Sequence, residues 1–137
     1  MATHVAIVDT MVLGALIQPG DTHPATPGYR QRIGNRAVLI SFVTLAEIRY
    51  GARKANWGEF RRRGLERDLA RFTVVQPDDA LITHCAELRD VCERRGHPLA
   101  QKLHDADRWI AATALRLDAV LVSDDGIFRD VPGLTLA

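Results

Sequence analysis

The sequence HVAIVD at residues 4–9 decides the fold, because a short run of apolar and β-branched residues there ends on an acid. Such a run is typical of a buried strand in a parallel sheet. Shorter apolar runs follow at residues 38–40, 72–75, 119–122 and 134–136. The sequence therefore predicts four strands and a short fifth one.

Segments with helical patterns alternate with these strands. The stretch PGDTHPATPG at residues 19–28 is instead rich in turn-forming residues. We expect helices at residues 10–17, 29–36, 42–51 after a Ser41 cap, 56–70, 77 to about 96, and 105–117. This alternation predicts an α/β fold with a mainly parallel sheet of four or five strands and helices on both faces.

The chain of 137 residues has room for one hydrophobic core, so we expect a single domain over residues 1–137. Apolar residues make up 47% and charged residues 26% of it, which fits a globular protein rather than a disordered one. No apolar run approaches the ~18 residues that a membrane span needs, and the N-terminus lacks the features of a secretion signal. We therefore expect a cytoplasmic protein with no membrane segment.

The two cysteines, Cys85 and Cys92, lie seven residues apart in a segment with helical periodicity. In a helix this spacing separates their Cα atoms by ~10 Å, which is too far for a disulfide. Neither belongs to a pattern typical of zinc sites. Both are expected to be reduced, with one or both facing the core.

A basic segment is hidden within the net charge of +1. Residues 49–71 contain eight basic and three acidic side chains, a net charge of +5. Most of the basic residues are arginine rather than lysine. A GC-rich genome would give this bias, and so would a role in binding phosphate, because the guanidinium group suits bidentate contact with it. A phosphate-binding face and an ordinary solvated helix face both remain open. The candidates for phosphate contact are Arg49, Arg53, Lys54, Arg61, Arg62 and Arg63.

Acids follow two of the predicted strands directly. Asp9 ends the first strand, and Asp124 and Asp125 follow the sequence VLVS at residues 120–123. In an open parallel sheet the carboxyl ends of the strands line one edge, and ligands bind in the crevice there. These side chains are therefore expected at the same edge.

Other acids lie near the starts of predicted helices. Asp105 and Asp107 open one helix, and Glu47 lies one to two turns into another. Helices that lead away from the sheet edge, or pack beside it, can bring Glu47 and Asp107 to the same crevice. The sequence thus predicts a cluster of Asp9, Glu47, Asp107 and Asp125.

Such a cluster is unfavourable without a cation. Two carboxylates at ~4 Å repel by roughly 4 kcal/mol at an effective dielectric constant of ~20, and they raise each other's pKa. Oxygen ligands prefer the hard ions Mg²⁺ and Mn²⁺, which can activate water for attack on a phosphodiester. The cluster therefore indicates metal-dependent phosphodiester chemistry.

Each acid also has a local structural explanation. An Asp after a strand, or before Gly126, is often a turn or cap residue. An acid in the first turn complements the helix dipole, and Glu47 can pair with a base such as Arg49. The joint occurrence of all four acids in this order favours the site.

Four sequence blocks span nearly the whole chain. They are Ile7-Val-Asp-Thr-Met-Val-Leu13, Ser41-Phe-Val-Thr-Leu-Ala-Glu-Ile-Arg-Tyr-Gly51, Asp105-Ala-Asp-Arg-Trp-Ile-Ala-Ala-Thr-Ala-Leu115 and Leu121-Val-Ser-Asp-Asp-Gly-Ile-Phe128. In this order and at this length they resemble the PIN-domain ribonucleases, most closely the toxin half of VapBC-type toxin–antitoxin pairs.

The resemblance implies roles for the acids. Its first block ends a strand on a metal-binding Asp, here Asp9, and its helix block supplies Glu47 followed four residues later by Gly51. Its third acid precedes Ile-Ala-Ala by three positions, which selects Asp107 over Asp105.

The fourth acid of the family lies two residues after a Ser or Thr that ends a strand. Here that residue is Ser123, which selects Asp125 over Asp124. By the same resemblance, Asp9 and Asp107 contact the metal directly, while Glu47 and Asp125 act partly through bound water. Asp105, Ser123 and Asp124 remain accessory residues near the site.

The resemblance also implies a three-layer α/β/α sandwich, a homodimer, and Mg²⁺- or Mn²⁺-dependent endonucleolytic cleavage of RNA. It further implies a growth-inhibiting toxin that is neutralised by a small antitoxin protein, which inserts a segment into the groove and often an Arg into the acid pocket. The basic segment then falls on helices beside the site, where its arginines can hold RNA phosphates.

The sequence allows two roles for each of four further residues and suggests one role for a fifth. Thr10 and Ser41 either orient site carboxylates or cap helices. His104 either touches the substrate or has a surface or capping role. Trp57 either stacks on a base or packs at a protein interface. Trp109, between Arg108 and Ile110, is expected to have a packing role.

Alternative functions are less well supported. A haloacid-dehalogenase-type phosphatase needs a second Asp two residues after the first, where this chain has Met11. A phosphate-accepting receiver domain needs a late Lys after a strand, and Lys102 precedes the wrong strand. A PIN-like RNA- or protein-binding module without catalysis stays open, although it needs no carboxylate cluster.

Overall fold

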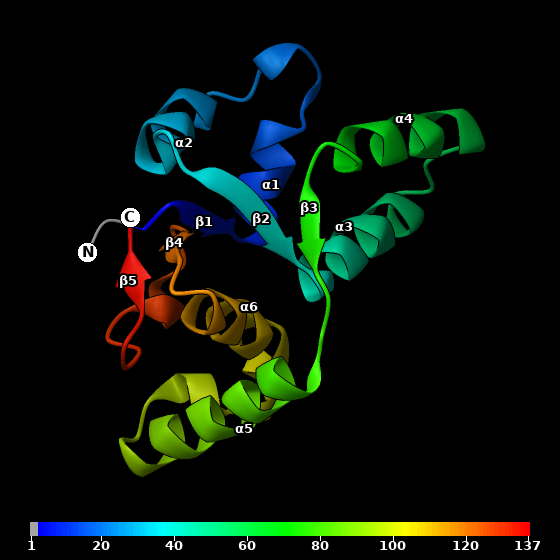
Figure 1. Cartoon of the computed structure of the whole chain (residues 1–137). Coiled ribbons are helices and arrows are strands. Elements are labelled where there is room, and N and C mark those ends of the chain that lie inside the picture. The colour runs from blue at the N-terminus through cyan, green and yellow to red at the C-terminus, as the bar shows by residue number, and fades with distance from the viewer. Residues whose placement is uncertain (1–2) are drawn as a thin grey trace.

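The computed structural model describes residues 3–137 and shows a central sheet with helices on both of its faces (Figure 1). The sheet has five strands in the order β3-β2-β1-β4-β5, and every neighbouring pair is parallel. The strands are β1 (Val5–Val8), β2 (Ala37–Ser41), β3 (Thr73–Val75), β4 (Val120–Val122) and β5 (Thr135–Leu136). The predicted α/β fold with a parallel sheet is confirmed.

Six α-helices connect these strands within the described part of the chain. They are α1 (Thr10–Leu16), α2 (Thr26–Ile33), α3 (Phe42–Lys54), α4 (Glu59–Leu69), α5 (Asp79–Arg94) and α6 (Asp105–Arg116). Four short 3₁₀ turns accompany them, namely η1 (Pro19–Asp21), η2 (Pro98–Ala100), η3 (Lys102–His104) and η4 (Gly126–Phe128). Each predicted helix has a counterpart, but boundaries of α2, α3 and α4 differ from the prediction by three residues.

The prediction of a helix at residues 29–36 was wrong in its boundaries. Helix α2 begins at Thr26, inside the stretch that was predicted as turns, with Pro27 in its first turn. Proline is tolerated there because its missing N–H would have no partner within the helix anyway. Gly34, with φ of +61°, ends the helix before Arg36.

The helices around residues 51–59 also differ from the prediction. Gly51 does not end α3, which continues to Lys54. Asn56 adopts a left-handed conformation with φ of +58°, so the predicted start of α4 at residue 56 falls in the turn between the helices. Helix α4 begins instead at Glu59, after Gly58.

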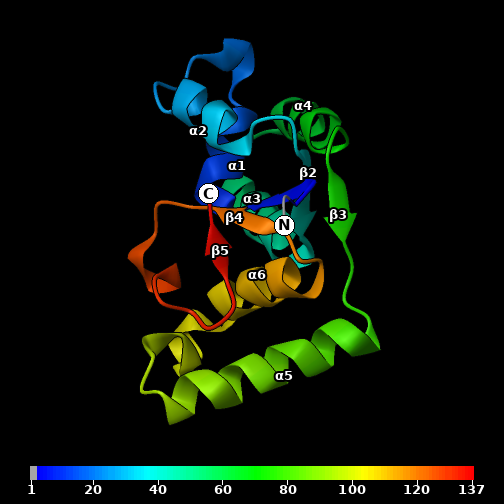
Figure 2. The same cartoon turned by 60° about the vertical axis from the view of Figure 1, so that its left-hand side comes forward.

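The central strand β1 shares its side chains between two layers of the core. Ala6 and Val8 pack with residues of α1, α2 and α4, whereas Ile7 packs with α5 and α6. Figures 1 and 2 show α6 against the sheet and α5 across the outer side of α6. The expected covering of both sheet faces by helices is therefore confirmed.

The two cysteines that were expected near the core are buried in it, and Trp109 packs against it. Cys85 and Cys92 are both buried and free, as predicted. Trp109 meets Phe42 edge to face, with their ring centroids 5.2 Å apart. Within residues 3–137, no helix combines the length and the apolar character that crossing a bilayer requires.

The strand register brings distant segments together at the carboxyl edge of the sheet. Val8 pairs with Val122, and the Asp9 N–H donates to the Val122 carbonyl at 3.3 Å. Helices α1 and α3 begin at this edge because each follows a strand directly, and α6 begins there because it runs back toward the start of β4. Residues after β1 and β4 thus meet the first turns of three helices.

Candidate active site

Asp9 is a buried carboxylate at the start of α1, with 7% of its surface exposed. Its Oδ1 accepts the Val12 N–H at 2.9 Å, and its Oδ2 accepts the Ser123 hydroxyl. Burial raises the pKa of Asp9, the nearby charges of Asp125 and Asp124 raise it further, and the Ser123 and Val12 hydrogen bonds oppose the shift. A negative charge at this position is unfavourable until a cation compensates it.

Ser123 links Asp9 to Asp125. Its Oγ accepts the Asp125 N–H at 3.0 Å while its hydroxyl donates to Asp9. The Asp125 carboxylate then accepts the Ile127 N–H at 3.0 Å and caps η4. Ser123 and Asp125 therefore lie beside Asp9. Asp125 caps η4 and is placed at the site at the same time.

Asp124 points toward α2 instead. Its carboxylate accepts the Tyr29 hydroxyl at 2.7 Å and the Arg32 guanidinium at 2.6 Å. These two hydrogen bonds lower the pKa of Asp124, in contrast to the raised pKa of Asp9. The two members of this acid doublet therefore have different partners.

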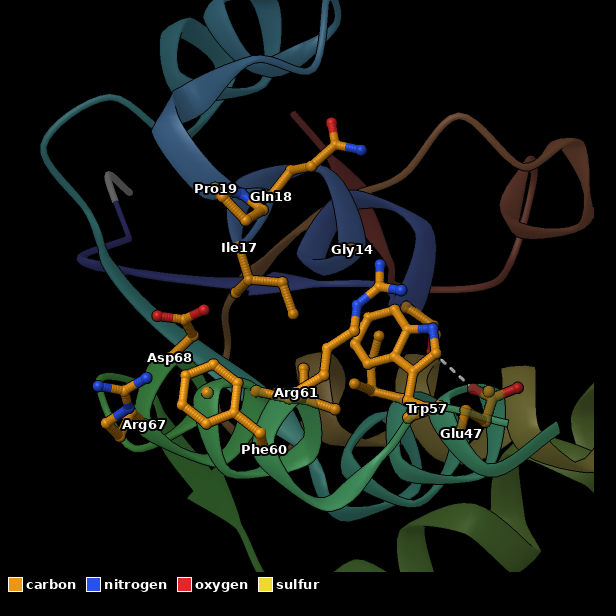
Figure 3. A pocket seen from close by; sticks show the side chains of 16 residues that line it. Gly14, Ile17, Gln18, Pro19, Glu47, Trp57, Phe60, Arg61, Arg67 and Asp68 are labelled. Atoms are coloured by element: carbon orange, nitrogen blue, oxygen red, sulfur yellow. Dashed lines mark hydrogen bonds between the residues drawn. The ribbon is translucent and has the colours of Figure 1, made fainter. Parts of the chain in front are cut away.

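Glu47 reaches the site edge from α3. The Thr10 hydroxyl donates to its Oε1 at 2.6 Å, and Figure 3 marks this bond with a dashed line. Thr10 directly follows Asp9, so this bond ties Glu47 to the strand end. Ser41, in contrast, caps α3 by accepting the Val43 N–H at 3.2 Å. Of the two hydroxyls with open interpretations, Thr10 orients a carboxylate and Ser41 is a cap.

Asp107 lies in the first turn of α6 and is paired with a histidine. His104 Nδ1 lies 3.0 Å from Asp107 Oδ2, and both side chains are partly buried. Asp105, two residues earlier, is bound by Arg108. Asp124 and Asp125 show the same division. In each pair of acids, an arginine binds one aspartate and the other aspartate has a different partner.

Arg108 is a buried arginine within the apolar face of α6, with 4% of its surface exposed. Its guanidinium donates to the carbonyls of Leu99 at 2.9 Å and Gln101 at 3.0 Å. It thereby holds the segment before α6 against the helix that carries Asp107.

Sequence reasoning did not single out Tyr29, Arg32 or Arg108. A charged residue inside an apolar helical run is a signal that points to Arg108. Arg32 has no comparable local signal, because its partner Asp124 lies 92 residues away.

The four predicted site acids lie toward the same edge of the sheet, but their carboxylates do not point to one common position. Among the described residues, no group of three or more His, Cys, Asp and Glu side chains is placed closely enough to hold an ion. Each predicted site acid takes its own hydrogen-bond partner instead, which limits repulsion between them. The donor set is made of oxygens and includes the desolvated Asp9, so it fits a hard divalent cation.

A groove of about 850 Å³ adjoins the acids between α1, α3 and α4. Thr10 and Glu47 line it, and Figure 3 shows Trp57, Phe60 and Arg61 opposite Ile17 and Gln18. The Arg61 guanidinium lies over the Trp57 ring, 3.6 Å from its centroid. Phe60 is 84% exposed at the rim, and Met11, next to the acids, is 79% exposed.

Two of the candidate phosphate-binding arginines are engaged by acids of α4. Arg49 pairs with Glu66 at 2.7 Å, and Arg63 lies 3.3 Å from Glu59. With Arg53 and Arg62, these residues surround a shallow hollow on the outer face of α3 and α4. The basic face therefore lies on the two helices next to the groove.

Sequence comparison gives relatives for this arrangement. Ribonuclease VapC1 of Haemophilus influenzae (strain R2866) is 30% identical over 93 residues, which cover 68% of this chain and 66% of that relative, just under two thirds of its length. The tRNA(fMet)-specific endonuclease VapC of Shigella flexneri is 29% identical over 102 residues, which cover 74% of each chain.

Solved structures have the same fold. The chain matches VapBC2 from Rickettsia felis, crystallised with a promoter DNA fragment, with a TM-score of 0.77 and 24% identity over 97% of both chains. It matches VapBC-1 from nontypeable Haemophilus influenzae with a TM-score of 0.71 and 23% identity over 97% of this chain and 96% of the other. At these identities the likeness concerns the fold.

The family model for the PIN domain matches residues 6–134, which is nearly the whole chain. The sheet order, the acids at its carboxyl edge and the VapC relatives agree with this match. The resemblance predicted from the four sequence blocks is confirmed, and the chain belongs to the PIN domain family.

Proposed function

We propose that this chain is a metal-dependent endoribonuclease that hydrolyses RNA phosphodiester bonds and acts as a growth-inhibiting toxin. The observation that carries the proposal is the desolvated Asp9 beside Ser123 and Asp125 at the carboxyl edge of a parallel sheet. This is the place where α/β proteins bind ligands, and buried carboxylates there call for a cation. The ribonuclease names of the sequence relatives support it.

The acids divide the work of holding the cation. Asp9 and Asp107 would bind Mg²⁺ or Mn²⁺ directly, and Glu47 and Asp125 would act through bound water. A bound divalent ion activates water and stabilises negative charge on the leaving oxygen. Hydrogen bonds from protein side chains fix the rest of the site: Ser123 orients Asp9, Thr10 orients Glu47, and His104 pairs with Asp107.

The basic helices would bind the RNA backbone. Within residues 3–137, Arg53, Lys54 and Arg62 have no acidic partner, so their charges are available for phosphate. Arg61 lies beside the groove on Trp57, while Arg49 and Arg63 share their charge with glutamates. Phosphate contacts of this kind give affinity without base selectivity, and their number sets the salt dependence of binding.

The groove next to the acids would receive the antitoxin. Its lining is mainly apolar, with Ile17, Trp57 and Phe60 around it, which suits a segment of a partner protein with apolar side chains. Solved structures with this fold come from VapBC systems, and this supports a cognate antitoxin for this chain. A homodimer is part of the same proposal, since the family resemblance implies it.

A cleavage assay tests this function. Purified protein is incubated with total RNA in Mg²⁺, in Mn²⁺ or in EDTA, alongside Asp9→Asn and Asp107→Asn variants whose folding is checked by circular dichroism. We expect cleavage with either metal only in the unaltered protein. Expression without an antitoxin, followed by mapping of new RNA 5′ ends, identifies the target. Full activity in EDTA, or in both variants, would exclude the mechanism.

The separation of the acids favours one other function. A PIN-like module that binds RNA or protein without catalysis needs no converged cluster, and none is formed among the described residues. It predicts binding without cleavage under any metal, so the same assay decides between the two. The phosphatase alternative is disfavoured by the PIN assignment and by Met11 at the position of its second Asp.

A further inference from the structure

The loop that follows β4 is tied to α2 by one tyrosine and one arginine. Tyr29 donates its hydroxyl to Asp124 Oδ2 at 2.7 Å. Arg32 donates to Asp124 Oδ1 at 2.6 Å and to the Ser123 carbonyl at 2.8 Å, while its Nε donates to the Ala137 carbonyl at 3.0 Å. We call Tyr29, Arg32 and Asp124 the α2 clamp.

The residues that the clamp holds are directly bonded to site residues. Arg32 fixes the main-chain carbonyl of Ser123, and the side chain of the same serine donates to Asp9. The clamp fixes the Asp124 side chain, and the next residue is Asp125, whose N–H donates to Ser123 Oγ. A change in the clamp therefore reaches Asp9 through Ser123 and its hydrogen bond, and it reaches Asp125 through the main chain next to Asp124.

The clamp also separates the two acids of the doublet. Without Tyr29 and Arg32, the Asp124 carboxylate would lose the two partners that hold it beside α2. Hydrogen bonds from Tyr29 and Arg32 turn Asp124 toward α2. Because Arg32 and Asp124 are partly exposed, their ion pair contributes little to global stability, so the effect of the clamp is local.

We propose that Tyr29 and Arg32 are positioning residues of the site, which hold Asp124 away from it and fix Ser123 and Asp125 beside Asp9 for cation binding. This inference rests on the proposed metal-dependent function. It assigns a role to two residues of α2 that lie outside all four sequence blocks of the family resemblance.

An effect of charge alone and an effect of positioning predict opposite changes in cation affinity when Arg32 is removed. Arg32→Met deletes a positive charge near the acids, so electrostatics alone would strengthen cation binding. Loss of positioning would weaken it, and removal of groups that orient metal ligands typically lowers metal affinity by 10–100-fold. The sign of the change in affinity thus separates the two explanations.

The experiment measures Mn²⁺ affinity by electron paramagnetic resonance, with Mg²⁺ competition, at neutral pH in the absence of RNA. We expect Arg32→Met to weaken Mn²⁺ binding by about tenfold. Tyr29→Phe, which keeps the buried ring and removes only the hydroxyl, should weaken it by roughly threefold. The matched control is Arg30→Met on the same helix, whose exposed side chain pairs with Asp21, and it should leave Mn²⁺ affinity unchanged.

A double variant tests whether the effect passes through Asp124. Asp124→Leu should weaken Mn²⁺ binding, and Tyr29→Phe added to it should have no further effect. Unchanged or tighter Mn²⁺ binding in both Arg32→Met and Tyr29→Phe would overturn the clamp while leaving the nuclease proposal intact. If the unaltered protein binds no Mn²⁺ and cuts no RNA, the proposed function and the clamp both fail.

Discussion

The two acid doublets are built on the same plan but in different surroundings. In each, an arginine holds one aspartate while the other aspartate has a different partner. Arg108 holds Asp105, and Arg32 holds Asp124. The Arg108 side chain is only 5% exposed, whereas that of Arg32 is 30% exposed. Arg108 is also the residue whose buried Nε has no hydrogen-bond partner among the described residues.

The difference in burial indicates what each arginine contributes. Desolvating a guanidinium is costly, so Arg108 is favourable only because its remaining N–H groups bind two carbonyls and Asp105. Removal of Arg108 therefore affects the whole fold. Arg32 remains hydrated, and its removal affects the local geometry of the loop after β4.

The largest expected effect is on catalysis and compares Asp107 with Asp105. Asp107→Asn should lower RNA cleavage by roughly a thousandfold, because loss of a metal ligand removes several kcal/mol of transition-state stabilisation. Asp105→Asn keeps an oxygen that can accept from Arg108 and should retain most of the activity. Single-turnover cleavage rates measure both. A larger loss in Asp105→Asn than in Asp107→Asn would reverse the assignment within this doublet.

The next effect is on stability and compares the two arginines. Arg108→Met should lower the free energy of unfolding by about 3 kcal/mol, since it leaves the Leu99 and Gln101 carbonyls without these donors. Arg32→Met should lower it by about 1 kcal/mol or less, because its ion pair with Asp124 is partly exposed. Urea unfolding of both variants gives the values. Similar losses would show that burial does not distinguish the two arginines.

Metal binding should distinguish the proposed metal ligands Asp9 and Asp107 from the arginine-bound acids Asp105 and Asp124. At ten times its dissociation constant, Mg²⁺ should stabilise the unaltered protein by about 1.4 kcal/mol. This gain should disappear in Asp9→Asn and Asp107→Asn and persist in Asp105→Asn and Asp124→Asn. Thermal unfolding with Mg²⁺ or EDTA provides the test. A gain that survives in Asp107→Asn would place the cation at the strand ends alone.

The smallest expected effects are on pH dependence, and they have opposite signs for Asp9 and Asp124. Burial raises the pKa of Asp9, so the folded state binds more protons than the unfolded chain between the two pKa values. Stability without metal therefore falls as pH rises above the ordinary value of 3.8, and Asp9→Asn should be more stable than the unaltered protein at neutral pH.

Asp124 should behave in the opposite way. Tyr29 and Arg32 lower its pKa, so its contribution to stability is present above 3.8 and is lost as pH falls through the folded value. Asp124→Asn should therefore lose stability at neutral pH and match the unaltered protein in acid. Urea unfolding in EDTA at several pH values measures both variants. If Asp9→Asn and Asp124→Asn changed the stability at neutral pH in the same direction, the different surroundings of the two acids would be contradicted.

Much of the fold was predictable because strands and acids follow local patterns. The run at residues 4–9 and the four sequence blocks predicted the parallel sheet, the alternation with helices and the edge to which Asp9 and Asp125 are delivered. The start of α2 was missed because Pro27 and Gly28 are turn formers by composition, although proline also suits a first helical turn. Propensity alone does not separate these two uses.

The supporting residues of the site were less accessible to prediction. The choice of Asp107 and Asp125 as site acids came from family resemblance, and it remains a prediction. The hydrogen bonds of Arg32 and Arg108 are consistent with it, since they engage the other acid of each doublet. The tertiary structure decides which acid an arginine binds. Arg32 and Asp124 are 92 residues apart, and a contact over this distance leaves no periodic signal in the sequence.

The burial of Cys85 and Cys92 between α5 and α6 has a practical consequence. Both thiols are enclosed, and burial raises the pKa of each, so a thiol-labelling reagent reaches them only after α5 moves away from α6. When closing is fast compared with labelling, the reaction rate reports the equilibrium constant for that opening. The two cysteines therefore serve as intrinsic probes of local unfolding at the helical layer that carries Asp107, without any added label site.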